Sequence, residues 1–501
     1  MSTMLWTSDA MATAMRAATQ GALPDGVTGL SIDSRTIAKG EAYFAIKGDV
    51  HDGHAFVEAA LKAGAGLAVV EAAQREKFPA EAPLLVVDDV LAGLVELAHA
   101  SRARLNAKII AVTGSVGKTS TKEALRRVLS AQGETHASVA SFNNHWGVPL
   151  SLARCPASTR FAVFEIGMNH AGEITPLVKM VRPHVAIITT IEPVHLEFFA
   201  GIEAIADAKA EIFSGLEPDG AVVLNRDNGQ FARLQKQAKK AGISRIVSFG
   251  ADKRAEARLI DLSLHATCSA VHADILDHDI TYKIGMPGRH MAMNSLAVLA
   301  GAALLGADIA RAALSLSQLE APTGRGLRRT LEVGHGEATL IDESYNANPA
   351  SMAAALAVLG QQPVRRVAVL GDMLELGEHG PALHAALAGH GIALGRLALV
   401  APIPPFATVW FERRAVRELG AAAQQERAHA RLVRGDARGE VAAKADAHER
   451  HAARVGLAAC QHVVQCHAAH LLVFRNEGHA GVEAQRVHLP RAGEQQQVVA
   501  A

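Results

Sequence analysis

The sequence has few cysteines, no excess of either charge and no long apolar run. Four cysteines in 501 residues exclude a disulfide-based scaffold and favour reduced thiols. The 50 basic residues balance the 50 acidic ones, so the charge does not indicate binding to nucleic acid or to a membrane surface. No stretch approaches the roughly 18 apolar residues of a membrane-spanning helix, and the N-terminus lacks the pattern of a signal peptide. We therefore expect a cytoplasmic protein that binds neither nucleic acid nor membrane.

The length and the pattern of the chain predict an α/β fold with three domains, at about 150 residues per domain. From residue 108, short apolar runs alternate with helical patterns, which is typical of a doubly wound parallel sheet buried on both faces. The predicted strands of this part are residues 108–113, 161–166, 185–191 and 221–225. A second α/β unit is predicted from strands 338–343 and 366–371 and helix 351–359. The predicted domains are residues 1–107, 108–319 and 320–501.

The strongest local signal is a glycine-rich segment, GSVGKTS, which follows a predicted strand and opens a predicted helix. Glycines allow the backbone to approach a phosphate, and a helix N-terminus favours an anion. Lys118 is expected to neutralise the β- and γ-phosphates of ATP, and Thr119 to ligate Mg²⁺. Val112 replaces the first glycine of the longer P-loop pattern, so the motif is a shortened form, with a simple glycine-rich turn as the alternative. The predicted nucleotide-binding residues are Gly114, Ser115, Val116, Gly117, Lys118, Thr119 and Ser120.

Further polar residues follow predicted strands, and each allows two interpretations. Glu165 ends a strand, where it could reach a Mg²⁺ ion shared with the nucleotide or lie in solvent. His195 is typical of a structural hydrogen-bond donor, and Lys209 of an exposed helix lysine. The segment DESYNANP (342–349) lies between a strand and a helix, so it is equally consistent with a binding loop and with a turn that caps the helix.

Together these motifs resemble the Mur ligase family from about residue 30 to about residue 390. After the P-loop come three further motifs in that family's order, NNHWGVPL (143–150), EIG (165–167) and HLE (195–197). Two segments resemble the branch of the family that adds D-alanyl-D-alanine, SYNANPASM (344–352) and GDMLELG (371–377). Two others resemble its UDP-substrate domain, DSR (33–35) and DGH (52–54). The resemblance implies an N-terminal domain for the UDP-linked precursor, a central P-loop ATPase domain and a Rossmann-like C-terminal ligase domain.

The resemblance also implies roles for residues that the sequence pattern alone does not single out. The residues implied at Mg²⁺ are Thr119, Glu165, His195 and Lys209, the last of them carbamylated into a carboxylate-like ligand. The implied catalytic residues are Lys118, Lys209 and His195. Further nucleotide contacts are implied for Asn294, Arg325 and Asp342. The UDP end of the precursor is implied at Ser34 and Arg35, and its peptide end at Tyr345 and Asn346.

The activity implied by the resemblance is that of an ATP-dependent, ADP-forming ligase of peptidoglycan synthesis. The terminal carboxylate of UDP-N-acetylmuramoyl-tripeptide would attack the γ-phosphate of ATP, and the amine of D-alanyl-D-alanine would then displace phosphate from the acyl phosphate. The implied cofactors are ATP, Mg²⁺ and a carbamylated Lys209, and we expect a monomer. An alternative is the family member that adds the third residue of the peptide, but its typical Asp-Asn-Pro-Arg segment is missing.

The composition changes after about residue 392, where thirteen arginines, one lysine and eight histidines follow. Neither a further strand nor the late Lys-Gly-Ser segment of the family is recognisable there. One hypothesis is a shift of reading frame near residues 388–400, and an alternative frame of the coding DNA without a Lys-Gly-Ser segment would contradict it. The change also supports a second alternative, a non-catalytic chain that binds ATP and the UDP-linked precursor but not the dipeptide.

Overall fold

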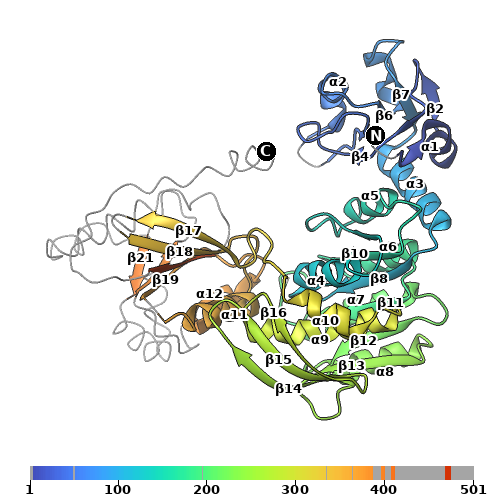
Figure 1. Cartoon of the computed structure of the whole chain (residues 1–501). Coiled ribbons are helices and arrows are strands. Elements are labelled where there is room, and N and C mark those ends of the chain that lie inside the picture. The colour runs from blue at the N-terminus through green and yellow to red at the C-terminus, as the bar shows by residue number, and fades with distance from the viewer. Residues whose placement is uncertain are drawn as a thin grey trace, which may run out of the picture.

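The computed structural model describes residues 4–48, 51–194, 196–333, 336–363, 365–387, 396–400, 408–411 and 469–474. The chain forms three α/β domains in sequence order, and the central domain lies between the other two (Figure 1). Helix α3 (Val90–Arg104) leads from the N-terminal domain into the central one (Figure 1). The predicted α/β fold class is confirmed.

A five-stranded sheet organises the N-terminal domain. In spatial order its strands are β2 (Ala18–Gln20), β7 (Leu84–Val87), β6 (Leu67–Glu71), β5 (Ala42–Phe44) and β4 (Leu30–Ser31). The remaining elements are the paired strands β1 (Trp6–Thr7) and β3 (Gly26–Val27) and the helices α1 (Ser8–Met15) and α2 (Val57–Lys62). Strands β5, β6 and β7 are apolar and buried apart from Glu71, and the sheet has one hydrophobic cluster on each face.

A nine-stranded sheet forms the centre of the second domain. In spatial order its strands are β16 (Asp279–Ile284), β15 (Ser269–Ile275), β14 (Ala257–Leu264), β13 (Arg245–Gly250), β12 (Ala221–Asn225), β11 (Val185–Ile188), β8 (Lys108–Thr113), β10 (Phe161–Glu165) and β9 (Thr135–Ala137). From β9 to β14 the neighbours are parallel, and β14 to β16 are antiparallel. Along β8, Ile110 and Val112 belong to one core cluster and Ile109 and Ala111 to the other. Burial on both faces explains the continuous apolar character of the strand.

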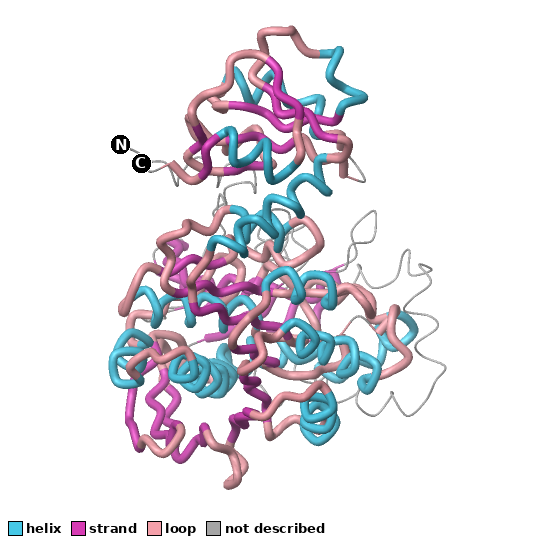
Figure 2. Tube along the Cα trace, turned by 90° about the vertical axis from the view of Figure 1, so that its right-hand side faces the viewer, coloured by secondary structure: helices cyan, strands magenta, loops and turns pink. Residues whose placement is uncertain are grey.

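Helices cover both faces of this sheet (Figure 2). On one side pack α4 (Lys118–Ser130), α9 (Arg289–Leu304) and α10 (Ile309–Leu316). On the other side pack α5 (Gly147–Ala153), α6 (Ile174–Val181), α7 (Ile202–Ala210) and α8 (Phe231–Lys240). Among the described residues, no helix combines the length and the apolar character that crossing a membrane requires.

The third domain has a six-stranded sheet. In spatial order its strands are β17 (Leu327–Val333), β18 (Gly336–Glu343), β22 (Ala469–Phe474), β19 (Arg365–Leu370), β20 (Arg396–Val400) and β21 (Thr408–Phe411). Its described helices are α11 (Pro349–Gly360) and α12 (Gly380–Ala386). The expectation that no strand follows residue 392 is therefore wrong. Apolar runs of four or five residues suffice for strands that pair with neighbours, and the average composition of a long segment hides such runs.

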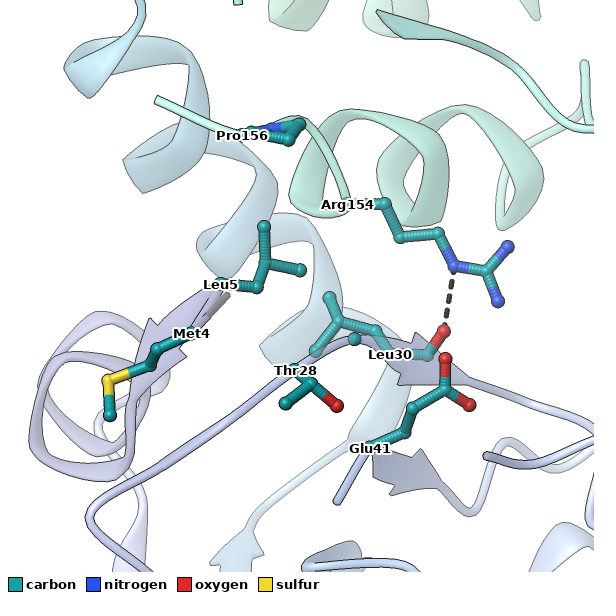
Figure 3. A pocket seen from close by; sticks show the side chains of 8 residues that line it. Met4, Leu5, Thr28, Leu30, Glu41, Arg154 and Pro156 are labelled. Atoms are coloured by element: carbon teal, nitrogen blue, oxygen red, sulfur yellow. Dashed lines mark hydrogen bonds between the residues drawn. The ribbon is translucent and has the colours of Figure 1, made fainter. Parts of the chain in front are cut away.

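Polar contacts fasten the N-terminal domain to the central one. The Trp6 indole Nε1 donates to Ala153 O at 2.9 Å, and the Arg104 guanidinium stacks 3.4 Å from the centre of a Trp6 ring. Arg154 Nε donates to Leu30 O at 2.7 Å. Beside these contacts a cavity of about 210 Å³ is lined by Met4, Leu5, Thr28, Gly29, Leu30, Glu41, Arg154 and Pro156 (Figure 3). No P-loop residue lines it, so this cavity is separate from the predicted ATP site.

Candidate nucleotide and magnesium site

The glycine-rich segment forms a tight loop between β8 and the N-terminus of α4. Gly114 has φ 144° and Gly117 has φ 85°, values that residues with a side chain rarely adopt. A Cβ atom at Gly114 would lie 2.0 Å from Thr189 Oγ1, and one at Gly117 would lie 2.7 Å from Asn294 Nδ2. Both glycines are therefore required by backbone conformation and by close packing. The loop has the strand–loop–helix context that phosphate binding requires.

Residues 189–192 support the loop from the neighbouring strand. Ser115 N donates to Thr190 O at 2.9 Å, and the Thr189 hydroxyl donates to Val116 O at 2.6 Å. The Ser115 hydroxyl accepts from Glu192 N at 3.0 Å. These contacts explain why β11 ends at Ile188 and not at the predicted residue 191, because the chain turns toward the P-loop there.

Lys118 lies across the loop, with Nζ donating to Gly114 O at 2.9 Å. Burial lowers its pKa most strongly, and the nearby cation Arg325 lowers it further, while Glu165 acts in the opposite direction. A lysine in such surroundings gains from a negatively charged partner, because an anion restores the stability of its charged form. Lys118 is therefore suited to a phosphate group.

Glu165 is suited to a metal ion. It ends β10, its side chain is only 1% exposed, and its Oε1 accepts from Asn143 Nδ2 at 2.7 Å. Its Oε2 is buried and has no hydrogen-bond partner, which is costly for a carboxylate unless a cation is bound. Thr119, in the first turn of α4 directly after the glycines of the P-loop, is also buried.

Among the described residues, no group of three or more His, Cys, Asp and Glu side chains surrounds a metal position. Thr119 and Glu165 carry oxygen atoms of the kind that Mg²⁺ takes as ligands together with nucleotide phosphates and water. The predicted ligand His195 lies outside the described residues.

Lys209 is buried in the last turn of α7, with 1% of its surface exposed, and is not the exposed helix lysine that its sequence context indicates. Burial holds its pKa well below the usual value, and the positive charge of Lys118 lowers it further. No described carboxylate raises it. Lys209 is thus an amine that favours the neutral, nucleophilic form beside the P-loop lysine.

Arg325 lies just before β17, in the connection between the central and the third domain, which we call the hinge. Its guanidinium lies 4.2 Å from the centre of the Tyr345 ring, and its Nη2 is 3.5 Å from Ser141 Oγ. Asp342 is buried at the end of β18, where its Oδ1 accepts from Ser344 N at 3.0 Å and its Oδ2 from Gly324 N at 3.3 Å. The structure thus places Asp342 of β18 beside the segment that carries Arg325, through its contact with Gly324.

The segment 342–349 caps a helix at its end and has exposed side chains near its start. Asn348 caps α11, since its Oδ1 accepts from Ser351 N at 2.9 Å while Ser351 Oγ accepts from Asn348 N at 3.1 Å. Tyr345 and Asn346 are exposed. The end of the segment is therefore a helix cap, and its start presents side chains beside Arg325.

The predicted UDP-binding residues lie in the N-terminal domain, away from the P-loop cluster. Arg35 is exposed and folds back on Asp33, with Nη2–Oδ2 at 2.7 Å and Nε–Oδ1 at 2.9 Å, while Ser34 is half-buried. His54 is structural, because its Nε2 accepts from Glu71 N at 3.0 Å and its Nδ1 lies 2.6 Å from Asp52 Oδ1. This pairing fixes the tautomer, with the proton on Nδ1.

Four residues that touch the cluster were given no role from the sequence. These are Ser141, Asn143, Thr189 and Glu343. Ser141 lies two residues before the motif that begins at Asn143, and Asn143 and Glu343 lie within quoted motifs. Nothing in the sequence pattern indicates that these three side chains contact the cluster. Thr189 fell within the predicted strand 185–191, whereas in the structure it follows β11, which pairs with β8.

Glu343 provides a pH-dependent test of the site. Its pKa is raised to about 8, mainly by burial and also by the charge of Asp342, while Arg325 acts in the opposite direction. Between about pH 4.5 and 8 the folded chain keeps a proton that the unfolded chain releases, so the free energy of unfolding falls as pH rises through this window. Glu343→Gln should remove this dependence. The difference in melting temperature, variant minus parent, should therefore increase by a few degrees from pH 6 to pH 9. Glu203→Gln, at an exposed position, is the control, and equal pH profiles for parent and Glu343→Gln would contradict the expectation.

The P-loop, the buried carboxylate and the arrangement of three α/β domains are typical of a nucleotide-binding enzyme. Comparison with known families identifies it further. Residues 26–102 match "Mur ligase family, catalytic domain", residues 112–302 match "Mur ligase middle domain", and residues 328–470 match "Mur ligase, glutamate ligase domain". The chain belongs to the Mur ligase family.

Individual relatives agree with this assignment. UDP-N-acetylmuramoyl-tripeptide--D-alanyl-D-alanine ligase of Rickettsia prowazekii is 35% identical over 362 residues, covering 72% of this chain and 78% of the relative. The Escherichia coli protein of the same name is 34% identical and covers 71% and 76%. Among solved structures, MurF from Acinetobacter baumannii has a TM-score of 0.69 at 31% identity, covering 79% and 85%. MurF from Thermotoga maritima in complex with ADP has a TM-score of 0.62 at 26% identity, covering 74% and 83%.

Proposed function

We propose that this chain is the ATP-dependent, ADP-forming ligase that joins D-alanyl-D-alanine to UDP-N-acetylmuramoyl-tripeptide in peptidoglycan synthesis. The observation that carries the proposal is a P-loop, with Lys118 and the buried carboxylate of Glu165 beside it, in a chain 34–35% identical to ligases of that name. Because the substrates include ATP and a UDP-linked precursor, we place the reaction in the cytoplasm. We also propose that the chain acts as a monomer.

The chemistry needs activation, since joining a carboxylate to an amine in water is unfavourable. The tripeptide carboxylate attacks the γ-phosphate and the bond to ADP breaks, which gives an acyl phosphate. The dipeptide amine then attacks the acyl carbon, loses a proton and expels phosphate. Lys118 stabilises the negative charge that develops on the phosphoryl oxygens, and the P-loop N–H groups orient the phosphates.

Thr119 and Glu165 would hold Mg²⁺, which when bound supplies positive charge to the phosphate oxygens. Asn294, packed against Gly117, and Arg325 and Asp342 at the hinge are suited to further nucleotide contacts. Arg325 adds positive charge next to Lys118, which supports a role at the phosphates. If the third domain closes over the nucleotide site, it would also exclude water from the acyl phosphate.

Lys209 is proposed to react with CO₂ and become a carbamate. Its neutral Nζ forms a bond to the carbon of CO₂ and loses a proton, so a buried amine becomes a buried carboxylate-like anion. The nearby charge of Lys118, which opposes protonation of Lys209, stabilises that anion instead. The carbamate oxygens would add hard ligands for Mg²⁺ beside Glu165.

The two ends of the precursor are proposed to bind in different domains. Ser34 and Arg35 would contact the UDP group, and Tyr345 and Asn346 would lie near the peptide. The exposure of Arg35, Tyr345 and Asn346 leaves these side chains accessible to a ligand.

The direct test is phosphate release by the full chain with ATP, Mg²⁺, UDP-N-acetylmuramoyl-tripeptide and D-alanyl-D-alanine. We expect release that requires the dipeptide, and L-alanyl-L-alanine serves as the control acceptor. Both the diaminopimelate and the lysine form of the tripeptide should be supplied. Binding of ATP and precursor without dipeptide-dependent release would contradict the ligase and support the non-catalytic alternative, which the altered composition after residue 392 favours.

A further inference from the structure

The loop between β9 and α5, residues 138–146, touches three parts of the candidate site at once. We call it the bridging loop. Its Ser141 Oγ lies 3.2 Å from Thr119 Oγ1 of the P-loop and 3.5 Å from Arg325 Nη2 of the hinge. Its Asn143 Nδ2 donates to Glu165 Oε1 at 2.7 Å. One short segment therefore connects the P-loop hydroxyl, the buried carboxylate and the hinge cation.

The bridging loop is firmly held. Lys122 of α4 is completely buried, and its Nζ donates to Ser138 O at 2.8 Å and to Ala140 O at 2.6 Å while pairing with Glu123 at 2.7 Å. Ala140 has φ 47°, a left-handed conformation that alanine seldom adopts. Such backbone strain persists only where the surroundings impose it, and it concentrates at functional sites.

Hydrogen-bond accounting assigns a direction to the contact between Ser141 and Arg325, while the contact between Ser141 and Thr119 can form in either direction. A serine hydroxyl offers one donor and two acceptor positions, and Arg325 donates only, so Ser141 accepts from Arg325. When Thr119 also donates to Ser141, both lone pairs of the threonine oxygen are left for a cation. In the same way, Asn143 occupies Oε1 of Glu165 and leaves Oε2, the oxygen without a partner, for the cation. The loop thus orients both described oxygen ligands.

We infer that Ser141 is a positioning residue that couples Arg325 at the hinge to Thr119 at the Mg²⁺ site. In the arrangement we infer, the Ser141 hydroxyl accepts from Arg325 Nη2 and from the Thr119 hydroxyl, which leaves the threonine lone pairs for the metal. Without Arg325, the Ser141 hydroxyl is free to rotate and compete for the same lone pairs. This inference rests on the proposed binding of Mg²⁺ and nucleotide at the P-loop.

The test is Mg²⁺-dependent binding of a fluorescent ATP analogue to the full chain, which needs no ligase turnover. Ser141→Ala should weaken the apparent Mg²⁺ affinity about tenfold or more, the usual effect of removing a group that orients a metal ligand. Nucleotide affinity without Mg²⁺ should be unchanged. Ser141→Thr keeps the hydroxyl and should restore Mg²⁺ affinity, and Ser158→Ala, at an exposed position, is the control. Circular dichroism melting verifies that each variant is folded.

A double-mutant cycle isolates the coupling. Arg325→Gln and Ser141→Ala should each weaken Mg²⁺ binding, and the double variant should be no weaker than the worse single variant. Parent-like Mg²⁺ affinity in Ser141→Ala, equal loss in Ser141→Thr, or additive losses in the cycle would overturn the inference while leaving the proposed function intact. A parent chain that binds no nucleotide would overturn the proposed function and the inference with it.

Discussion

Replacing Lys118 by alanine should abolish dipeptide-dependent phosphate release, with a loss in kcat/KM of at least about a hundredfold. Lys118 is the cation of the P-loop, and its surroundings already disfavour its charge unless an anion is present. Removing it leaves the phosphoryl oxygens without their nearest protein charge as the bond to ADP breaks. Initial-rate measurements over a range of ATP concentrations would determine the effect on kcat/KM.

The matched control is Lys62→Ala. Lys62 is exposed on α2 and pairs with Glu58, so its loss should leave the rate within about twofold of the parent, since surface ion pairs contribute little. Binding of the fluorescent ATP analogue should also weaken in Lys118→Ala and not in Lys62→Ala. Retained turnover in Lys118→Ala would refute the assignment of the P-loop.

Replacing Lys209 by glutamine should have an effect of similar size, for a different reason. The parent chain should carry a carbamate on Nζ, because the amine is buried, its pKa is well below the usual value and Lys118 lies close by. Glutamine cannot take up CO₂, so the variant would lack the proposed anion beside Lys118. We expect at least about a hundredfold loss of turnover.

Carbon-13 NMR after addition of labelled bicarbonate tests the carbamate directly. A carbamate signal is expected in the parent and in Lys179→Gln, where the replaced lysine is exposed on α6, and not in Lys209→Gln. Small carboxylates such as acetate should partly restore turnover in Lys209→Gln by occupying the place of the carbamate. An active Lys209→Gln variant, or a parent without the signal, would argue against carbamylation.

Several features were predictable from the sequence because they depend on local pattern. The run of residues 108–113 followed by GSVGKTS predicted β8, the P-loop and α4, since apolar periodicity and glycine positions are readable along the chain. The burial of Lys209 was not readable, because it depends on how α7 packs on the sheet. The bridging by Ser141 was equally hidden, since Thr119, Ser141 and Arg325 are separated by up to about 200 residues. The strands after residue 392 were missed because short apolar runs lie within a polar composition.

Strand β22 (Ala469–Phe474) lies between β18 and β19, and its position fixes an order of events during synthesis. About 100 residues separate β19 from β22, which at roughly 5–20 residues per second occupies the ribosome for on the order of 5–20 s. During that interval the N-terminal and central domains are complete, while β18 and β19 each present an uncovered edge, and such edges pair readily with other chains. The newly made protein therefore passes through a stage with two finished domains and one open sheet, and insertion of β22 ends its exposure to aggregation.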